Sequence, residues 1–520
     1  MAKRNKKPVI YFGSRSFPLQ EMLLDDFEYI EIRDMLEPPV KGQPLFKEGG
    51  FNRFYQDALF LLDETTPWID QPVVLTALPA NQLLCEKSLK ISAKCEEILD
   101  LKGAHRFDFD DPDSVAETIN TCFFGGQDGY RLQPSAFTIA PNFSGDVRQA
   151  GQVYHELSGN FGDQWHLAAY PNYAQWVPAN IQDAILVEFE RLNNNVHIKA
   201  VLNQYDTNTN EFLRVDELVD DDLRSGFLVK GGKSGCNVQL LIYIGGSGSL
   251  RIGQFHLRRS RAPFGEFLLN DHRLMDTDGM NTDVSVYFDA GDLKPPLSVY
   301  FSGYRSAEGF EGNYMMRNFG TPFLLFADSR LEGGAFYLGS SALQDQIVDV
   351  IQRTLKRLHF KPSDLLLSGL SMGTFGALYY GAKLAPNAIV VGKPLVNIGT
   401  IADGTQLRRE SSEFATSLDM LTMYEGSLKR SKELNQRFWE VFKKGDFSHT
   451  TFVFAYMLND DYDPKAFQKI RSFLKENEPN ARILSKGLPG RHNDDTNGIV
   501  IWFVMQYRHL LHQQYGRQFD

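Results

Sequence analysis

The pattern of apolar residues along the second half of the chain predicts a parallel sheet. From about residue 285, apolar runs alternate with stretches whose apolar residues recur at helical spacing. Most of these runs lack polar alternation, which is typical of strands buried on both faces. The alternation predicts a doubly wound α/β domain. The expected strands are LSVYFSGY, PFLLFAD, DLLLSGL, AIVVGKPL and TTFVFAYML, and the expected helices are ALQDQIVDVIQRTLKRL, GTFGALYYGAKL, ELNQRFWEVFKKG and DPKAFQKIRSFLKEN.

The pattern between residues 180 and 262 has a different period. Apolar and polar residues alternate in runs such as VHIKAVLNQY and NVQLLIYI, with turn signals such as DTNTN between them. Short alternating runs at this spacing predict an antiparallel, β-sandwich-like domain. GGSGSL at residues 245–250 is interpreted as a hairpin, and the basic cluster HLRRSR at 256–261 as a solvated strand end.

The first 150 residues mix both patterns and predict a small N-terminal α/β domain. Strands are expected at Val9–Phe12 and at 72–78, and helices at Arg53–Asp63 and 81–101. The segment 133–177 is rich in Pro, Gly, Asn and Ser and is expected to be a linker. The predicted domains are 1–155, 156–275 and 276–520.

Composition narrows the class of protein. The 520 residues are 42% hydrophobic with 39 phenylalanines and carry a net charge of −11. Large cores are therefore expected, and broad binding to nucleic-acid phosphates is not. Four cysteines without a CxxC pair favour a reducing compartment. The basic N-terminus is followed by an apolar run too short for a signal peptide, and no segment is long and apolar enough to span a bilayer. A cytoplasmic protein is expected, with membrane association only through partners or a surface.

The segment GLSMG at residues 369–373 points to chemistry. It is a GxSxG motif between a predicted strand and a predicted helix, which is the context of a nucleophile elbow. Ser371 would project its hydroxyl above the sheet, and Gly369 and Gly373 would leave room for the tight turn. Gly376 and Gly381 would let the helix pack closely on the sheet. The alternative is a glycine-rich turn without catalysis.

A serine nucleophile needs an acid, which in this fold class follows it in the chain. The loop NDDYDP after the strand TTFVFAYML offers three aspartates. Asp460 is closest to the strand end and is the first candidate, with Asp461 second. Asp463, beside a proline, is expected to cap the next helix. A solvated loop of helix-capping carboxylates is the alternative.

The base is expected after one more strand. His492, in the loop GRHNDD, is the candidate, because the two histidines that follow it in the chain fall in a helical stretch. The predicted chemistry is acyl transfer through an acyl-enzyme. Two backbone N–H groups must bind the oxyanion. Met372 is expected to supply one, and Gly303 or Tyr304 the other. No spacing of histidines and carboxylates suggests a metal site.

Several longer strings closely resemble one family of proteins. GDLKPPLSVYFSGYRSAEGFEG, LEGGAFYLGS, LLLSGLSMGTFGALYYGA, VVGKPL, AYMLNDDYD and GRHNDDT resemble the second accessory secretory protein of the accessory Sec system, and GSLRIGQFHLRRSR extends the resemblance into the β domain. These strings are far more specific than GxSxG. The resemblance implies an α/β-hydrolase-like C-terminal domain with Ser371 as nucleophile, an acid in NDDYD, and His492 as base.

The resemblance also implies a function. Family members accompany the export of serine-rich repeat glycoproteins and O-acetylate N-acetylglucosamine on them. The implied partners are two sister accessory proteins, a dedicated export ATPase and the glycoprotein, at the cytoplasmic side of the membrane. No permanently bound cofactor is implied, and the acetyl donor is left open. Two alternatives remain: a carbohydrate esterase with the same triad, and a scaffold of the export machinery.

Overall fold

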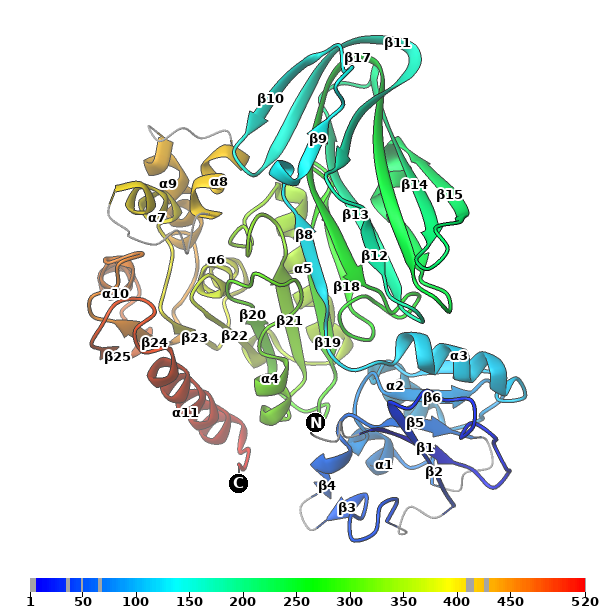
Figure 1. Cartoon of the computed structure of the whole chain (residues 1–520). Coiled ribbons are helices and arrows are strands. Elements are labelled where there is room, and N and C mark those ends of the chain that lie inside the picture. The colour runs from blue at the N-terminus through cyan, green and yellow to red at the C-terminus, as the bar shows by residue number, and fades with distance from the viewer. Residues whose placement is uncertain are drawn as a thin grey trace.

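The chain forms three large β-sheets that follow one another in sequence. The structure is a computed structural model that describes residues 6–33, 38–47, 50–63, 68–407, 416–424 and 430–519, so the basic head at residues 1–5 lies outside the described residues. Figure 1 shows the first sheet in blue, the second in cyan and green, and the third at the centre with the helices of the C-terminal half around it.

The first sheet is parallel and has the strand order β2-β1-β5-β6-β7. Its strands are β1 (Lys7–Phe12), β2 (Phe27–Ile32), β5 (Leu59–Leu62), β6 (Leu83–Glu86) and β7 (His105–Phe107). Its helices are α1 (Pro72–Ala77), α2 (Ala93–Leu101) and α3 (Pro112–Cys122), and a small hairpin of β3 (Phe46–Lys47) and β4 (Gly50–Phe51) and the 3₁₀ turn η1 (Arg53–Tyr55) complete the unit. The predicted α/β character is confirmed.

Two predicted elements of this unit are wrong. The segment 53–63, expected to be a helix, contains η1 and the buried strand β5, and 72–78, expected to be a strand, forms α1. Short apolar runs fit either structure, and the proline at the start of α1 is the better indicator because it suits the first turn of a helix. The predicted helix over 81–101 is right only for α2 at its end, since the first part holds the strand β6 followed by a turn.

The second sheet has ten strands, and its pairs are antiparallel as predicted. The strands are β8 (Gly129–Leu132), β9 (Phe137–Ile139), β10 (Asp146–Ala150), β11 (Tyr154–Pro171), β12 (Gln175–Val177), β13 (Gln182–Arg191), β14 (Val196–Asp206), β15 (Phe212–Val219), β16 (Phe227–Lys230) and β17 (Cys236–Arg259), with 3₁₀ turns η2 (Pro134–Ala136) and η3 (Asp220–Ser225). The two halves of β17 pair with β14 and β13 respectively, yet both contribute to one buried cluster. The sheet therefore folds over on itself.

Three predictions fail in this sheet. The expected linker at 133–177 contains β9, β10, β11 and β12. GGSGSL is no hairpin but lies inside β17, where the positive φ angles of Gly246 and Gly248 accommodate an irregularity opposite β11. The cluster HLRRSR is not solvated, because His256 and Arg258 are buried. The predicted domain limits at 155 and 275 stay predictions.

The third sheet has the order β18-β19-β21-β20-β22-β23-β24-β25, and it is parallel from β21 onward. The five predicted strands are confirmed as β20 to β24. The strands are β18 (His272–Asp276), β19 (Thr282–Asp289), β20 (Leu297–Phe301), β21 (Phe323–Asp328), β22 (Leu365–Leu370), β23 (Ala388–Gly392), β24 (Thr451–Met457) and β25 (Arg482–Leu488).

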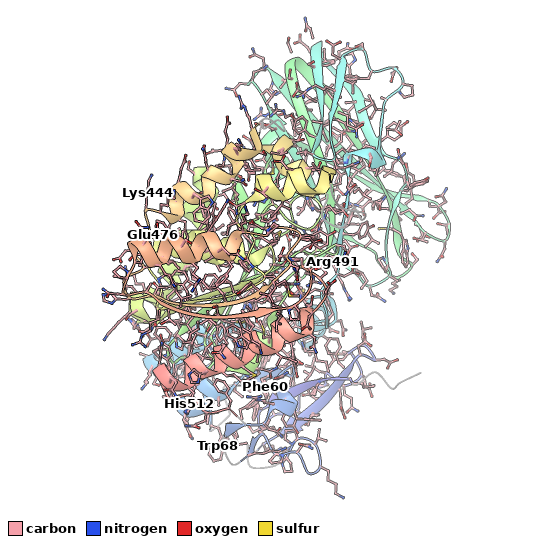
Figure 2. The ribbon with its side chains drawn as sticks, turned by 90° about the vertical axis from the view of Figure 1, so that its left-hand side faces the viewer. Phe60, Trp68, Lys444, Glu476, Arg491 and His512 are labelled. Atoms are coloured by element: carbon pink, nitrogen blue, oxygen red, sulfur yellow. The ribbon has the colours of Figure 1, made fainter. Side chains whose placement is uncertain are left out.

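Helices cover both faces of the third sheet. Along β22, Leu365 and Leu367 join the core under α5, α6 and α9, whereas Leu366 and Leu370 join the core under α4 and α11. Figure 2 shows α10, labelled at Glu476, and α11, labelled at His512, on opposite sides of the same strands. The helices are α4 (Asn313–Phe319), α5 (Ser341–Arg357), α6 (Gly373–Leu384), α7 (Ile398–Leu407), α8 (Thr416–Met423), α9 (Ser431–Phe442), α10 (Ala466–Asn477) and α11 (Thr496–Tyr515), with the 3₁₀ turn η4 at Pro362–Asp364. This is the doubly wound arrangement predicted.

Candidate active site

Ser371 occupies a tight turn between β22 and α6. Its φ angle is +52°, in the left-handed region that residues with a Cβ rarely adopt. The Ser371 N–H donates to the Gly392 carbonyl at 2.8 Å, and the Ser371 carbonyl accepts a hydrogen bond from the Thr374 hydroxyl at 2.5 Å. The neighbouring strand and the following helix therefore hold the serine in its strained conformation.

The glycines around Ser371 are required by close backbone contacts. A Cβ on Gly369 would lie 2.4 Å from the Gly373 carbonyl oxygen, and a Cβ on Gly373 would lie 2.0 Å from the Phe301 carbonyl oxygen. A Cβ added to Gly376 or Gly381 would lie 2.6 or 2.5 Å from side chains of the sheet. The structure thus gives the first pair to the turn and the second pair to helix packing, as predicted.

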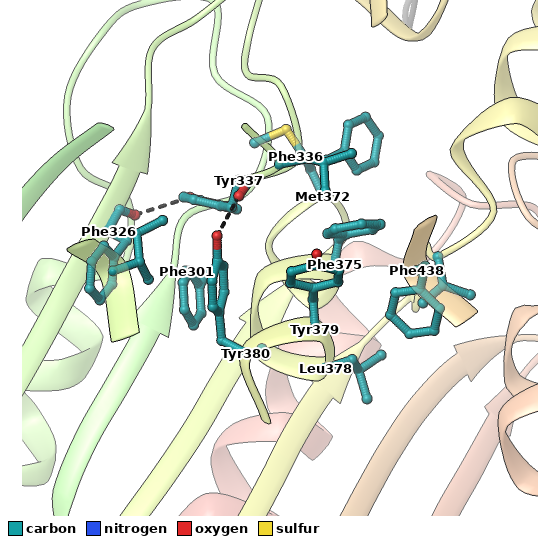
Figure 3. Packing of buried hydrophobic residues seen from close by; sticks show 14 of the residues in the cluster. Phe301, Phe326, Phe336, Tyr337, Met372, Phe375, Leu378, Tyr379, Tyr380 and Phe438 are labelled. Atoms are coloured by element: carbon teal, nitrogen blue, oxygen red, sulfur yellow. Dashed lines mark hydrogen bonds between the residues drawn. The ribbon is translucent and has the colours of Figure 1, made fainter. Parts of the chain in front are cut away.

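Aromatic rings pack beside α6 and against the end of β20 (Figure 3). The rings of Phe301 and Tyr380 stack with centroids 5.7 Å apart. The Tyr337 hydroxyl shares its one hydrogen between the Ser302 carbonyl at 2.7 Å and the Phe326 carbonyl at 3.1 Å, and the Tyr380 hydroxyl donates to the Tyr337 carbonyl at 2.7 Å. These bonds fix the end of β20 against the helix that begins beside the serine.

His492 lies in the loop between β25 and α11 and is 1% exposed. Its Nε2 is 2.9 Å from the Ser371 Oγ, and its Nδ1 is 2.7 Å from Asp460 Oδ2. A carboxylate only accepts hydrogen bonds, so Nδ1 carries the hydrogen and Nε2 is left to accept from the serine hydroxyl. The Tyr462 ring stacks on the imidazole with centroids 4.3 Å apart and fixes its plane.

The two adjacent carboxylates contact different parts of this histidine. Asp460 binds the imidazole, and its other oxygen accepts the N–H groups of Tyr462 and Asp463 at 2.8 and 3.2 Å. Burial would raise the pKa of Asp460, but the hydrogen bond and charge of His492 and these two N–H groups outweigh it, so the pKa lies below its usual value. Asp461 accepts the backbone N–H of His492 at 3.1 Å.

Asp463 does not cap α10, contrary to the prediction. Its carboxylate is buried and accepts the N–H groups of Val396 and Asn397 at 2.9 and 2.7 Å, together with the Asn397 side-chain amide. The Asp463 side chain therefore fastens the loop after β24, residues 459–464, to the segment between β23 and α7. The residue before α10 is Lys465, which makes no side-chain capping bond.

The predicted oxyanion donors differ in their surroundings. Met372 precedes α6, where the first N–H groups of a helix have no acceptor within the helix. The Gly303 N–H, in contrast, donates to Glu311 Oε2 at 2.6 Å. It is therefore not open to a substrate, contrary to the prediction. Tyr304 is the other donor predicted on this loop. Sequence reasoning missed Glu311, because nothing in the string EGFEG distinguishes it from its neighbours.

Lys393 is a second residue that sequence reasoning missed. It follows β23, has a φ angle of +59°, and donates from Nζ to the Thr496 hydroxyl at 3.1 Å. Burial lowers its pKa, while the charges of Asp460 and Glu311 act in the opposite direction. It therefore places a buried cation close to two carboxylates of the site. The feature of the sequence that could have identified Lys393 is its position in VVGKPL, directly after a buried strand.

These contacts define the class of protein. It is a mixed α/β protein in which a serine, a histidine and an aspartate form a continuous chain of hydrogen bonds. The chain lies beside three consecutive parallel strands. Among the described residues, no group of three or more His, Cys, Asp or Glu side chains could hold a metal ion.

Comparison with known proteins gives the particular family. The family model described as "Accessory Sec system GspB-transporter" matches residues 19–517, so the chain belongs to this family, that of accessory secretory protein 2 of the accessory Sec system. It is 43% identical to the accessory Sec system protein of this family from Staphylococcus aureus over 399 residues, which cover 76% of this chain and 75% of that protein. It is 37% identical to the Streptococcus gordonii member over 418 residues, covering 80% and 81%. The solved Gap123 complex of Streptococcus agalactiae contains a chain that is 33% identical, with a TM-score of 0.84 and coverage of 99% of this chain and 100% of that chain.

Proposed function

We propose that this accessory Sec system protein is an α/β-hydrolase-type serine acyltransferase that O-acetylates N-acetylglucosamine residues of serine-rich repeat glycoproteins and also supports their export. The observation that carries the proposal is the chain of hydrogen bonds from Ser371 through His492 to Asp460. The strained φ angle of Ser371 supports it, because backbone strain of this kind is typical of nucleophile elbows.

The first half of the reaction loads the enzyme. His492 Nε2 takes the proton of Ser371, whose Oγ attacks the carbonyl carbon of an activated acetyl ester. Asp460 stabilises the imidazolium that forms, and the backbone N–H of Met372 stabilises the oxyanion. When the tetrahedral intermediate collapses, the bond to the leaving group breaks, and His492 gives its proton to that group.

The second half transfers the acetyl group. A sugar hydroxyl takes the place of the leaving group, His492 removes its proton, and its oxygen attacks the acetyl-enzyme carbonyl. Collapse of the second intermediate releases the O-acetyl sugar and returns the proton to Ser371. Water in place of the sugar would make the same site an esterase, so transferase activity requires that water be excluded from the loaded site.

The proposed setting is the cytoplasmic face of the export machinery. The proposed partners are the two sister accessory proteins, the export ATPase and the glycoprotein, with no nucleic acid and no permanently bound cofactor. The similarity to a chain of the Gap123 complex supports assembly with sister proteins. Among the described helices, none has both the length and the apolar character to cross a bilayer, and membrane association is proposed to occur through the partners.

The proposal is tested by Ser371→Ala in cells that export a serine-rich repeat glycoprotein, with glycan acetylation measured by mass spectrometry and export by secretion of the glycoprotein. Acetylation is expected to disappear while export continues. Ser368→Ala is the matched control, because it removes a buried hydroxyl from β22, the strand that leads to Ser371, where this hydroxyl donates to the Val299 carbonyl. Increased acetylation in Ser371→Ala would indicate an esterase, and unchanged acetylation would leave only a scaffold.

A further inference from the structure

Two loops of the third sheet come close to the neighbours of Ser371. They are the β20–α4 loop, residues 302–312, and the β21–α5 loop, residues 329–340. A Cβ on Gly303 would lie 3.1 Å from the carbonyl oxygen of Leu370, and a Cβ on Gly334 would lie 2.4 Å from the Met372 side chain. Any displacement of these loops therefore changes the surroundings of the nucleophile.

Glu308 in the middle of the β20–α4 loop is bound by the second sheet. Its side chain is fully buried. Oε1 lies 2.5 Å from Nδ1 of His256 and 3.3 Å from Nε of Arg131, and Oε2 accepts from Nε of Arg258 at 2.6 Å. The Glu308 N–H donates to the Gly129 carbonyl at 2.9 Å. These partners belong to β8 and β17, so a loop of one sheet is held by strands of another.

The same strand region reaches further points of both loops. Arg131 donates from Nη1 to the Leu331 carbonyl in the β21–α5 loop and from Nη2 to the Ser306 carbonyl at 3.5 Å in the β20–α4 loop. The Gln127 side chain accepts from the Phe310 N–H at 2.7 Å and donates to the Phe310 carbonyl at 3.1 Å. The second sheet and the segment leading into it therefore fix the β20–α4 loop on both sides of Glu308.

The charges around Glu308 make this attachment strong. His256 also contacts Glu188 at 3.2 Å, and Arg258 binds Asp283 through two bonds of 2.9 and 3.1 Å. Burial would raise the pKa of Glu308, but the charges of His256 and Arg258 lower it to about 2, so the group is ionised at neutral pH. Breaking a buried ion pair by removing one partner leaves uncompensated charge, which is strongly unfavourable.

The inference that follows from the attachment of Glu308 to the second sheet rests on the proposed acyl transfer. We propose that Glu308 is a positioning residue, which fastens the β20–α4 loop to the second sheet so that the Gly303–Tyr304 backbone keeps its place beside Ser371. The basic cluster of β17 then serves the active site of the third sheet, although its residues do not touch the reacting atoms.

The test compares Glu308→Gln with Glu266→Gln in the full chain. Glu266 binds the same arginine, with Oε2 3.0 Å from Nη1 of Arg258, but lies outside both loops. The burst of p-nitrophenol that p-nitrophenyl acetate releases before the first turnover reports the rate of acyl-enzyme formation at Ser371. Glu308→Gln is expected to slow this burst roughly tenfold to a hundredfold, mainly through its limiting rate at saturating ester rather than through the half-saturating ester concentration, and Glu266→Gln to stay within about twofold of the parent. Equal rates for all three proteins, or equal losses in both variants, would overturn the proposal.

Hydrogen exchange of the peptide covering residues 303–311 tests the attachment without catalysis. Exchange is expected to quicken in Glu308→Gln and to be unchanged in Glu266→Gln, and equal exchange would overturn the inference. Glu308→Asp, which keeps the charge on a shorter side chain, is expected to recover part of the rate and serves if the glutamine variant does not fold. If the parent shows no activity that Ser371→Ala removes, the proposed function fails, whereas the exchange result still decides whether Glu308 holds the loop.

Discussion

Asp460 and Asp461 are adjacent in the chain, but they support His492 through different atoms. Asp460 binds Nδ1 of the ring at 2.7 Å, and Asp461 accepts the backbone N–H at 3.1 Å. The first contact sets the tautomer and offsets the charge that the imidazole gains during proton transfer. The second contact holds the loop, and a neutral oxygen can make it equally well.

The isosteric changes Asp460→Asn and Asp461→Asn separate these two contacts. In Asp460→Asn we expect kcat to fall by about three to four orders of magnitude, because an amide no longer enforces the productive tautomer. In Asp461→Asn the amide oxygen still accepts the His492 N–H, and kcat is expected to stay within about threefold of the parent. Steady-state kinetics with p-nitrophenyl acetate measure both. Similar losses in the two variants would contradict the assignment of Asp460 to the ring.

The individual residues of the site also differ in how well the sequence predicts their contacts. The order of serine, acid and histidine along the chain predicted that Ser371, Asp460 and His492 come together, because the motif and its strand ends are local features. The structure brings Ser371 and Asp460 each within hydrogen-bond distance of His492. The choice between Asp460 and Asp461 was ranked only by distance from the strand. Glu311 on the Gly303 N–H was not predicted, since this contact depends on how the β20–α4 loop closes.

Two elements, the end of β22 and the start of α6, together hold Ser371 in its turn. The strand continues directly into the turn, and the helix begins at Gly373, where any side chain would meet the Phe301 carbonyl oxygen at 2.0 Å. A backbone oxygen of a central strand has little freedom to move. The turn is therefore intolerant of added volume at this position.

Gly373→Ala is expected to lower both stability and activity. The added methyl group cannot be accommodated without moving β20 or α6, and overpacking of this kind typically costs about 1–3 kcal/mol. The matched control is Gly125→Ala, where a Cβ would have no neighbour within 4 Å. Thermal unfolding monitored by fluorescence should show a lower Tm for Gly373→Ala alone. Equal Tm values for the two variants would refute the close contact.

Prediction of the elements succeeded where the pattern was long and uniform. The continuous apolar runs of β20 to β24 marked buried parallel strands, because both faces of that sheet are covered by helices. It failed for β5 and α1, whose runs are short enough to fit either period. It also failed for GGSGSL, since glycines that suit a turn suit an irregularity inside a long strand equally well.

In the molecule as a whole, the second sheet and the β20–α4 loop of the third sheet share a buried ionic cluster. His256 faces Glu188, Glu308, Arg258 and Asp283. Burial would lower the pKa of His256, but the carboxylates of Glu308 and Glu188 outweigh it and raise the pKa to about 9. The sequence could not predict this cluster, because its members come from distant segments that only the packing of two sheets brings together.

This cluster predicts a pH dependence of stability. The folded state binds the His256 proton more tightly than the unfolded state, so its contribution is fully present below the ordinary pKa of 6.5 and is lost as the pH rises through about 9. The Tm of the parent should exceed that of His256→Gln, by an amount equivalent to roughly 1–3 kcal/mol at about pH 6 and much less at about pH 10. A difference that is constant over this range, measured by calorimetry at matched ionic strength, would be inconsistent with a charged His256.

The proposed acyl transfer requires that Ser371 carries the acetyl group between the two half-reactions. The most direct measurement is peptide mass spectrometry of protein that has been incubated with p-nitrophenyl acetate and quenched in acid. We expect the mass of one added acetyl group on the peptide containing Ser371, its near absence in His492→Ala, and its complete absence in Ser371→Ala. An unmodified Ser371 peptide, or equal acetylation in His492→Ala and the parent, would contradict it.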